Sequence, residues 1–290
     1  MTKTLDTLIE DIYSLFNTDH QIPEERLQEF GQRLASHLRS RINETRGPGS
    51  LRMSNMGQPC ERKLYFSVHN SDEAEPSSPY LRLKFLIGDI LEELVLWLAE
   101  EAGHSVEGRQ DELNIDGVEG HRDAIIDGVI VDVKSASSLS FKKFENHLTE
   151  LDDAFGYLTQ LQSYSYASRE DPRVTNKNMA AFVVIDKTLG KMCIDRHFGM
   201  ASVDLSQTPS RKRAMLKSPE APPRGFMLED DGKSGNQKLG LNCSYCEFKW
   251  KCWDNLKVYN YSGKPRYLAV VKRPPNVDQL SKEAVFGKHE

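Results

Sequence analysis

Long uninterrupted apolar runs are absent from this 290-residue sequence. Its most apolar segment, residues 81–101, is interrupted by charged side chains at Arg82, Lys84, Asp89 and Glu92. A membrane-spanning helix needs roughly 20 consecutive apolar residues, so no membrane crossing is predicted. The opening residues, MTKTLD, also lack the apolar core of a secretory signal. We therefore expect a cytoplasmic, intracellular protein with no membrane partner.

An excess of positive charge is absent too. The 38 Lys and Arg residues are outnumbered by 43 Asp and Glu residues, which leaves a formal net charge of −5. This balance argues against a protein that coats duplex DNA through bulk electrostatics. The sequence also contains no Gly-x-Ser-x-Gly elbow and no His-Glu-x-x-His pair, so serine-hydrolase and zincin chemistry lack their motifs.

Cysteine is scarce, but three of the five cysteines are closely spaced. Cys243, Cys246 and Cys252 form a C-x2-C-x5-C pattern, while Cys60 and Cys193 stand far upstream. Disulfides are a poor interpretation in the reducing interior that we expect. Four thiolates suit either tetrahedral zinc or a [4Fe–4S] cluster, and spacing alone leaves both open. Cys193 lies in an alternating strand pattern, so we expect it in the core and outside such a site.

The most informative motif is a D-x-K triplet at the end of a predicted strand. Val129–Val131 is a β-branched run, and Asp127-Gly128 before it is a turn dipeptide, so a hairpin is predicted. Side chains alternate along a strand, which places Asp132 and Lys134 on one face. A carboxylate there can hold a hard cation, and the lysine can orient water or neutralise phosphate charge.

Two predicted helices flank this strand in the sequence. On the first, residues 81–101, Gly88 and Glu92 are four apart and share one face. We expect the glycine to admit the backbone of another element, and Glu92 to lean over the strand carboxylates. On the second helix, Gln160 and Tyr164 offer neutral donors that could hold a phosphate or the attacking water.

The order of these motifs resembles the RecB-like branch of the PD-(D/E)xK nuclease superfamily over most of the chain. Gly-x-x-x-Glu on a helix is followed by Gly-x-x-Asp, by Asp-x-Lys and by Gln-x-x-x-Tyr. The resemblance implies that Asp123 and Asp132 bind Mg²⁺ or Mn²⁺ and that Lys134 is the catalytic lysine. It also implies that Gln160 and Tyr164 help to place the DNA.

The third acidic ligand departs from the pattern of the family. Glu92 stands where many members carry a histidine, although glutamate is also a sound ligand for Mg²⁺ or Mn²⁺. Glu93 is its main rival for that role.

The cysteines resemble those of the iron–sulfur members, which include the four-cysteine exonucleases associated with CRISPR systems and the AddB nuclease domain. This similarity implies a [4Fe–4S] cluster, with zinc as the less favoured occupant. The four ligands would be Cys60, Cys243, Cys246 and Cys252.

The expected fold class is α/β (α+β), with one large domain or a core with an appendage. As the resemblance implies, it would have a restriction-endonuclease-like core, with a central mixed β-sheet flanked by helices. The expected segments are a helical N-terminal region (1–46), the first cluster cysteine with a mobile loop (47–79), the PD-(D/E)xK nuclease core (80–200), a basic Pro/Ser/Gly-rich connection (201–240), a C-terminal cysteine module (241–262), and a C-terminal strand and tail (263–290).

Local patterns predict individual elements within these segments. Leu5–Phe16 and Pro23–Ile42 are amphipathic and predict helices. Residues 181–186 and 192–198 alternate between apolar and polar side chains and predict a strand pair.

The function expected from the resemblance is a metal-dependent deoxyribonuclease, acting as an exonuclease on single-stranded DNA ends in DNA processing, recombination or degradation. Basic and aromatic side chains are interleaved around the last cysteines, a composition that suits single-stranded nucleic acid. Two alternatives stay open: a zinc-stapled DNA endonuclease, and a non-catalytic nucleic-acid-binding adaptor that uses the same fold as a scaffold. The intact pair of aspartates and the lysine favour the enzyme over the adaptor.

Overall fold

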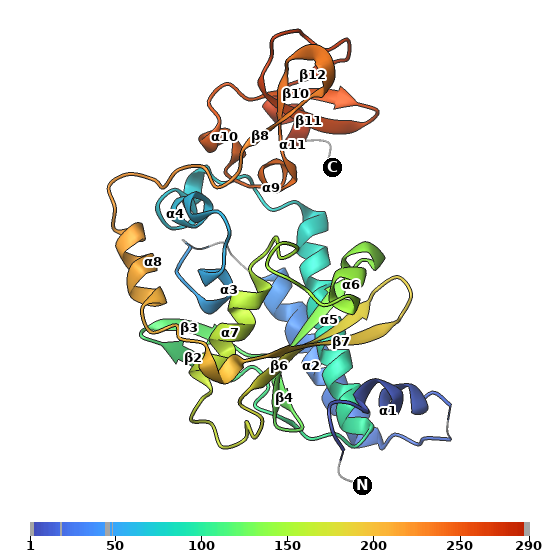
Figure 1. The fold of residues 1–290 in the computed structure, drawn as a ribbon. Helices are drawn as coiled ribbons and strands as arrows, with labels where there is room; N and C mark the ends of the chain where they lie inside the picture. The colour runs from blue at the N-terminus through green and yellow to red at the C-terminus, as the bar shows by residue number, and fades with distance from the viewer. Residues whose placement is uncertain (1–2, 18, 44–46, 48, 287–290) are drawn as a thin grey trace. The chain divides into compact units, whose positions relative to one another are not determined.

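The computed structural model describes residues 3–17, 19–43, 47 and 49–286. The chain divides into two compact units, which are treated separately (Figure 1). The first unit comprises residues 1–46, 51–57 and 82–214, and the second comprises residues 47–50, 58–81 and 215–290. Helices and both parallel and antiparallel strand pairs occur, so the fold is of the mixed α/β class. None of the helices in the described ranges combines the length and apolarity that a membrane crossing needs.

A five-stranded sheet forms the centre of the first unit. In spatial order its strands are β1 (Val106–Glu107), β4 (Ala124–Ile126), β5 (Val129–Ala136), β6 (Met179–Asp186) and β7 (Met192–Phe198). β5 and β6 are parallel, whereas the other neighbours are antiparallel, so the sheet is mixed, as predicted. A separate two-stranded sheet pairs β2 (Glu112–Ile115) with β3 (Val118–His121).

The turn between β4 and β5 is the one that the sequence predicts. Asp127 and Gly128 have φ angles of 49° and 78°, the left-handed region that both central residues of a type I′ hairpin require. A Cβ atom at Gly128 would lie 1.9 Å from Oγ1 of Thr175, so only glycine fits there. The turn sets the register in which Ala124 pairs with Val131, and this register aims the side chains of β5.

Helices cover both faces of the central sheet (Figure 1). The helices of the first unit are α1 (Leu8–Ser14), α2 (Glu24–Ile42), α3 (Met53–Met56), α5 (Pro79–Glu101, whose first residues belong to the second unit), α6 (Ser138–Glu145) and α7 (Tyr157–Ala167). Ile130 and Phe182 project to the face covered by α3, α6 and α7. Val131 and Val183 project to the opposite face, against α1 and α5. Burial on both faces explains why β5 is an almost continuous apolar run.

α2 has no fully buried residue and is attached to α5 by charged and aromatic contacts. Arg26 contacts the carboxylates of Glu100 at 2.6 Å and Glu101 at 2.7 Å. The ring of Phe30 stacks on Trp97 with a centroid separation of 4.9 Å. α5 is therefore held between the sheet on one side and α2 on the other. These contacts fix the rotation of α5 about its axis and so the direction in which Glu92 projects.

The second unit is built on an antiparallel sheet of five short strands. In spatial order these are β12 (Gln279–Leu280), β10 (Lys257–Tyr261), β11 (Lys264–Val270), β9 (Gln237–Leu239) and β8 (Leu228–Asp230). Its α-helices are α4 (Glu61–His69), α9 (Leu241–Ser244), α10 (Lys249–Cys252) and α11 (Lys282–Phe286). The short helical turns are η1 (Ser71–Glu73) and η3 (Gly232–Ser234). The remaining elements, η2 (Met200–Ser202) and α8 (Thr208–Leu216), lie between β7 and the second sheet in the sequence.

Most of the predicted elements are confirmed. The two N-terminal helices, the long helix that begins near residue 81 and the strand pair of residues 181–198 are all present. Residues 201–240, expected to be a connection, contain α8, β8 and β9. The predicted tail from residue 273 contributes β12, which pairs with β10. Such short strands carry little periodicity, and their cross-strand partners, remote in sequence, determine their conformation.

Candidate functional site

Asp132 and Lys134 project from the same face of β5, as their spacing predicts. Nζ of Lys134 lies 2.6 Å from Oδ2 of Asp132, and the aspartate is completely buried. Lys134 pairs with Oδ2 of Asp132, whereas Oδ1 has no hydrogen-bond partner in the described part of the chain. Buried polar atoms are rarely left so. The carboxylate therefore has lone pairs available for a cation.

Asp123 lies in the short segment between β3 and β4, beside the D-x-K triplet. Its Oδ2 atom accepts a hydrogen bond of 2.7 Å from the backbone N–H of Val133. Burial raises the pKa of Asp123 well above its usual range, and the negative charges of Asp132 and Glu92 raise it further. Adjacent buried carboxylates of this kind are stabilised when a divalent cation lies between them.

Glu92 approaches the two aspartates from α5. Burial and the charge of Asp132 raise the pKa of Glu92 to about 7. Nε2 of Gln110 donates a hydrogen bond of 2.6 Å to Oε1 of Glu92. The carboxylate oxygens of Glu92, Asp123 and Asp132 do not all lie within 4.8 Å of one another in the described structure. Mg²⁺ needs only one or two direct carboxylate ligands because it retains several waters.

Glu93, the rival acidic residue, is occupied elsewhere. Its Oε1 atom lies 2.8 Å from Nη1 of Arg109 and 3.1 Å from Nε of Arg33. Successive residues on a helix differ in direction by about 100°. Glu92 therefore shares the environment of Asp132, and Glu93 is neutralised by arginines on another side of α5.

The charge on Lys134 is strongly favoured. Burial acts to lower the pKa of Lys134, but the carboxylates of Asp132 and Asp123 outweigh it and hold that pKa above its usual range. The ammonium also lies 4.8 Å from the centroid of the Tyr157 ring. Lys134 is thus a fixed positive charge suited to a developing negative charge on a phosphate.

Gln160 and Tyr164 come together on α7, as their spacing predicts. Nε2 of Gln160 lies 2.6 Å from the hydroxyl oxygen of Tyr164. Burial raises the pKa of Tyr164, and the charge of Asp132 adds to this effect. The phenol accordingly stays protonated and able to donate a hydrogen bond near the carboxylates.

Two features of this site escape the sequence-based prediction. Gln110, which binds Glu92, has a φ of 53° in a loop, and no motif points to it. Gly88 does not admit the backbone of another element, contrary to expectation: a Cβ atom there would meet only Oγ of Ser135 at 3.7 Å, an ordinary contact.

Four cysteines line one cavity of the second unit. Cys60 immediately precedes α4, and the other three belong to the α9–α10 segment: Cys243, Cys246 and Cys252. The cavity contains about 330 Å³ of space, part of it open to solvent, and is also lined by Lys63 and Arg224. Burial raises the pKa of Cys243 to about 11, and the other three cysteines contribute to the rise. The thiols therefore favour a group that supplies positive charge.

The four cysteines are widely spaced and have charged, aromatic and glycine neighbours. No three thiol sulfurs in the described ranges lie within 4.8 Å of one another. The guanidinium of Arg224 donates to the carbonyl oxygen of Cys252 at 2.6 and 3.1 Å and lies over the ring of Trp253. A Cβ atom at Gly225 would lie 3.1 Å from Sγ of Cys60. Cys193 is on β7 in the first unit, packed against the main core.

Comparisons with known proteins show little similarity. No protein-family model matches the chain, and no curated protein matches its sequence. Among solved structures, the chain is similar to one described as SSO0001, with 14% sequence identity and a TM-score of 0.41. The match covers 77% of this chain and 95% of that one.

Proposed function

We propose that this protein is a metal-dependent deoxyribonuclease of the PD-(D/E)xK type, with a restriction-endonuclease-like core. One observation carries the proposal: the buried Asp132 carboxylate, whose Oδ1 atom has no hydrogen-bond partner in the described chain, lies beside Lys134 in a group that includes Asp123 and Glu92. The ion pair with Lys134 involves Oδ2 and leaves the lone pairs of Oδ1 available. Their availability is what a cation-binding carboxylate requires.

The donors fit Mg²⁺ or Mn²⁺, because all of them are carboxylate oxygens. Asp132 and Asp123 would hold the ion, with Glu92 as a third ligand or a partner of its bound water. A cation bound there supplies Lewis-acid stabilisation of a phosphate oxygen and lowers the pKa of coordinated water. Lys134 keeps its positive charge and donates to the oxygen on which negative charge develops.

Residues of α7 and its preceding loop would position the substrate. Gln160 and Tyr164 offer neutral donors to a phosphate or to the attacking water. The ring of Phe155 is 64% exposed and lies 5.3 Å from that of Tyr157, which contacts Lys134. An exposed aromatic ring that packs on a second ring, itself in contact with a lysine, suits the stacking of an unpaired base. This arrangement supports single-stranded DNA as the substrate, and exonuclease action on its free ends is proposed from the resemblance of the sequence motifs alone.

The cysteine cavity supports a structural [4Fe–4S] cluster. A single zinc ion with Zn–S bonds of about 2.3 Å would place its thiolates about 3.8 Å apart. The cysteines in this cavity are not gathered so closely. A four-iron cluster is held by one thiolate at each of its irons and so suits more widely spaced ligands. Cys60, Cys243, Cys246 and Cys252 would hold it, and it would stabilise the second unit.

The decisive experiment is a time course on three end-labelled substrates: linear single-stranded, linear duplex and circular single-stranded DNA. With Mg²⁺ or Mn²⁺, the protein should degrade the linear single strand fastest and leave the circle intact, and EDTA should stop the reaction. Asp132→Asn should reduce cleavage to background. Its control, Asp116→Asn, changes an exposed turn residue and should cleave at the wild-type rate.

Other outcomes of this assay would contradict the proposal in specific ways. Rapid cutting of the circle would indicate the endonuclease alternative. Equal degradation of RNA would widen the substrate class. DNA binding without any cleavage, in protein whose fold is intact by circular dichroism, would indicate the adaptor alternative.

A further inference from the structure

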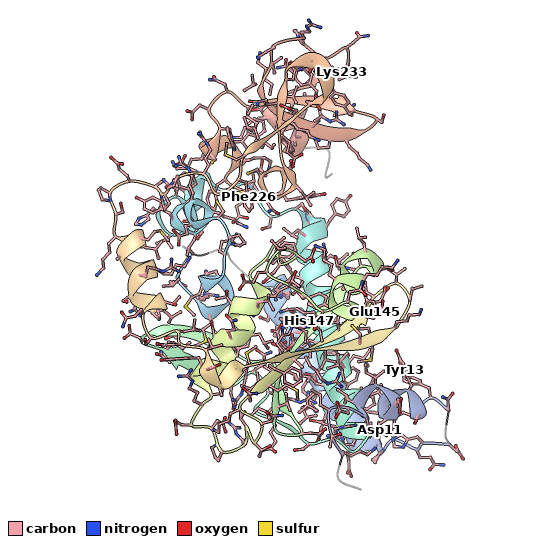
Figure 2. The ribbon with its side chains drawn as sticks, viewed as in Figure 1. Asp11, Tyr13, Glu145, His147, Phe226 and Lys233 are labelled. Atoms are coloured by element: carbon pink, nitrogen blue, oxygen red, sulfur yellow. The ribbon has the colours of Figure 1, made fainter. Side chains whose placement is uncertain are left out.

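A second group of potential ligands lies on the central sheet of the first unit. It consists of His147, which is labelled in Figure 2 and lies in the loop after α6, and of Asp195 and His197, both on β7. Nδ1 of His147 lies 2.7 Å from Oδ1 of Asp195, and Nε2 of His197 lies 3.0 Å from Oδ2. One potential ligand atom from each residue can be chosen so that all lie within 4.8 Å of one another. These are two imidazoles converging on one carboxylate.

The burial of the group differs from one residue to the next. The side chain of Asp195 is 2% exposed, that of His197 9% and that of His147 59%. The backbone N–H of Leu148 donates a hydrogen bond of 2.9 Å to Oδ2 of Asp195 and fixes the carboxylate. Two ligands are therefore rigid and buried, while the third closes the group from the solvent side.

His147 is held in an unusual backbone conformation. Its φ of 70° lies in the left-handed region, which costs a non-glycine residue conformational energy. Its ring stacks on that of His197 with a centroid separation of 4.5 Å. Two stacked imidazoles repel each other when both are protonated. Nδ1 of His147 and Nε2 of His197 both face Asp195. A shared cation can therefore use the lone pairs of these two nitrogens together with the carboxylate.

We propose that His147, Asp195 and His197 bind a divalent first-row transition-metal ion such as Zn²⁺. Two nitrogens and one oxygen suit this class of ion better than Mg²⁺ or Ca²⁺, which take oxygen ligands. Metal–ligand distances of about 2.0–2.2 Å allow one ion to reach donors up to about 4 Å apart. His147 is 59% exposed, so the solvent side leaves a coordination position for water or an anionic group.

The position of this site on the sheet relates it to the carboxylates of β5. Asp132 pairs with Phe182 of β6, and Phe182 pairs with Asp195 of β7, so all three project to one face. The ring of Phe182 packs edge-on against His197, with centroids 5.4 Å apart. The proposed site is therefore two strands away from Asp132, across a buried phenylalanine. It is independent of the proposed nuclease activity, because it uses none of the same ligands.

Cobalt(II) is a suitable probe because its visible spectrum reports its ligands. The 290-residue protein would be titrated with Co²⁺, with Mg²⁺ in excess to occupy the carboxylate site, and each spectrum would be read as the difference from the cobalt-free protein, which removes the absorbance of any group at the cysteines. Wild type should bind one equivalent, with visible bands and no sulfur-to-cobalt charge-transfer band. His147→Ala should weaken this binding at least about tenfold, the lower end of what losing support for a metal ligand costs. His147 is exposed, so the variant should fold.

His20→Ala is the control, because it removes another exposed histidine of the same unit. It should bind Co²⁺ with the wild-type affinity and spectrum. The proposal would be overturned if His147→Ala bound Co²⁺ as wild type does. It would also be overturned if all bound Co²⁺ showed thiolate bands or was displaced by Mg²⁺. Loss of DNA cleavage in Asp132→Asn, with Co²⁺ binding unchanged, would separate this site from the nuclease site.

Discussion

Replacing Glu92 with glutamine should stabilise the metal-free protein at pH 8. Burial and the charge of Asp132 raise the pKa of Glu92 from 4.5 to about 7. Between these values the folded state retains a proton that the unfolded state has lost, so stability falls as the pH rises through this window. Glutamine stays neutral at every pH and keeps an oxygen for the hydrogen bond from Gln110, so it avoids this loss.

The size of the effect follows from the same pKa. A rise from 4.5 to about 7 corresponds to about 3 kcal/mol of destabilisation at pH 8. This shift already includes the attraction between Glu92 and Lys134, so Glu92→Gln should recover up to about 3 kcal/mol at pH 8. At pH 4 the gain should be close to zero, because Glu92 is then protonated in both states. Saturating Mn²⁺ should reverse the order, since the cation favours the carboxylate.

Glu93, the next residue on α5, provides a control for which the opposite change in stability is expected. Glu93→Gln makes the same chemical change one position along α5, but it removes a buried partner of Arg109 and Arg33. It should therefore destabilise the protein by about 1–3 kcal/mol. Hydrogen exchange of the amides of β5 and β6, in urea and EDTA, measures the first unit by itself. If Glu92→Gln destabilised these strands at pH 8 as Glu93→Gln does, the carboxylate cluster would not exist as described.

Three further predictions concern single positions. Lys134→Ala should lower the rate of cleavage by about 10²–10³ without a matching loss of DNA affinity, as measured by single-turnover kinetics and filter binding. Cys246→Ala should lose the bound iron and its visible absorbance, whereas Cys193→Ala should keep both; stoichiometric zinc without iron in anaerobically prepared wild type would refute the cluster. Gly88→Ala should stabilise the first unit by about 0.5–1 kcal/mol in urea unfolding, because its Cβ finds only an ordinary contact with Ser135.

The sequence predicts the strand that carries Asp132 and Lys134 well because its signals are local. The β-branched run Val129–Val131 and the turn Asp127-Gly128 define a hairpin, and strict alternation then places Asp132 and Lys134 on one face. Helical spacing likewise brings Gln160 and Tyr164 together. In each case the geometry depends on residues close in the sequence, where the regular periods of helix and strand apply.

Contacts between segments that are distant in the sequence cannot be predicted from the periods of helix and strand. Gln110 reaches Glu92 from a loop, and nothing in its neighbourhood in the sequence indicates a polar partner on α5. His147 joins Asp195 and His197 only because the loop after α6 lies beside the edge strand β7, a tertiary arrangement with no sequence motif. The Gly-x-x-x-Glu spacing on α5 points to Glu92, but it cannot exclude Glu93, whose pairing with Arg33 and Arg109 becomes visible only in the structure.

The order of the segments explains why the second unit would benefit from a cluster. Cys60 and Cys243 belong to one unit, but the largest part of the first unit, residues 82–214, lies between them in the sequence. Bringing together the ends of the ~180-residue segment between these cysteines costs on the order of 5 kcal/mol of chain entropy. The second unit has a sheet of short strands and a small core with which to offset this cost. A cluster held by Cys60 from one segment and by the three later cysteines from the other would add its binding free energy to the free energy that the second unit gains by burying apolar side chains. Asp123 and Asp132 lie within the intervening segment and rest on their own sheet, so their geometry does not require the cluster.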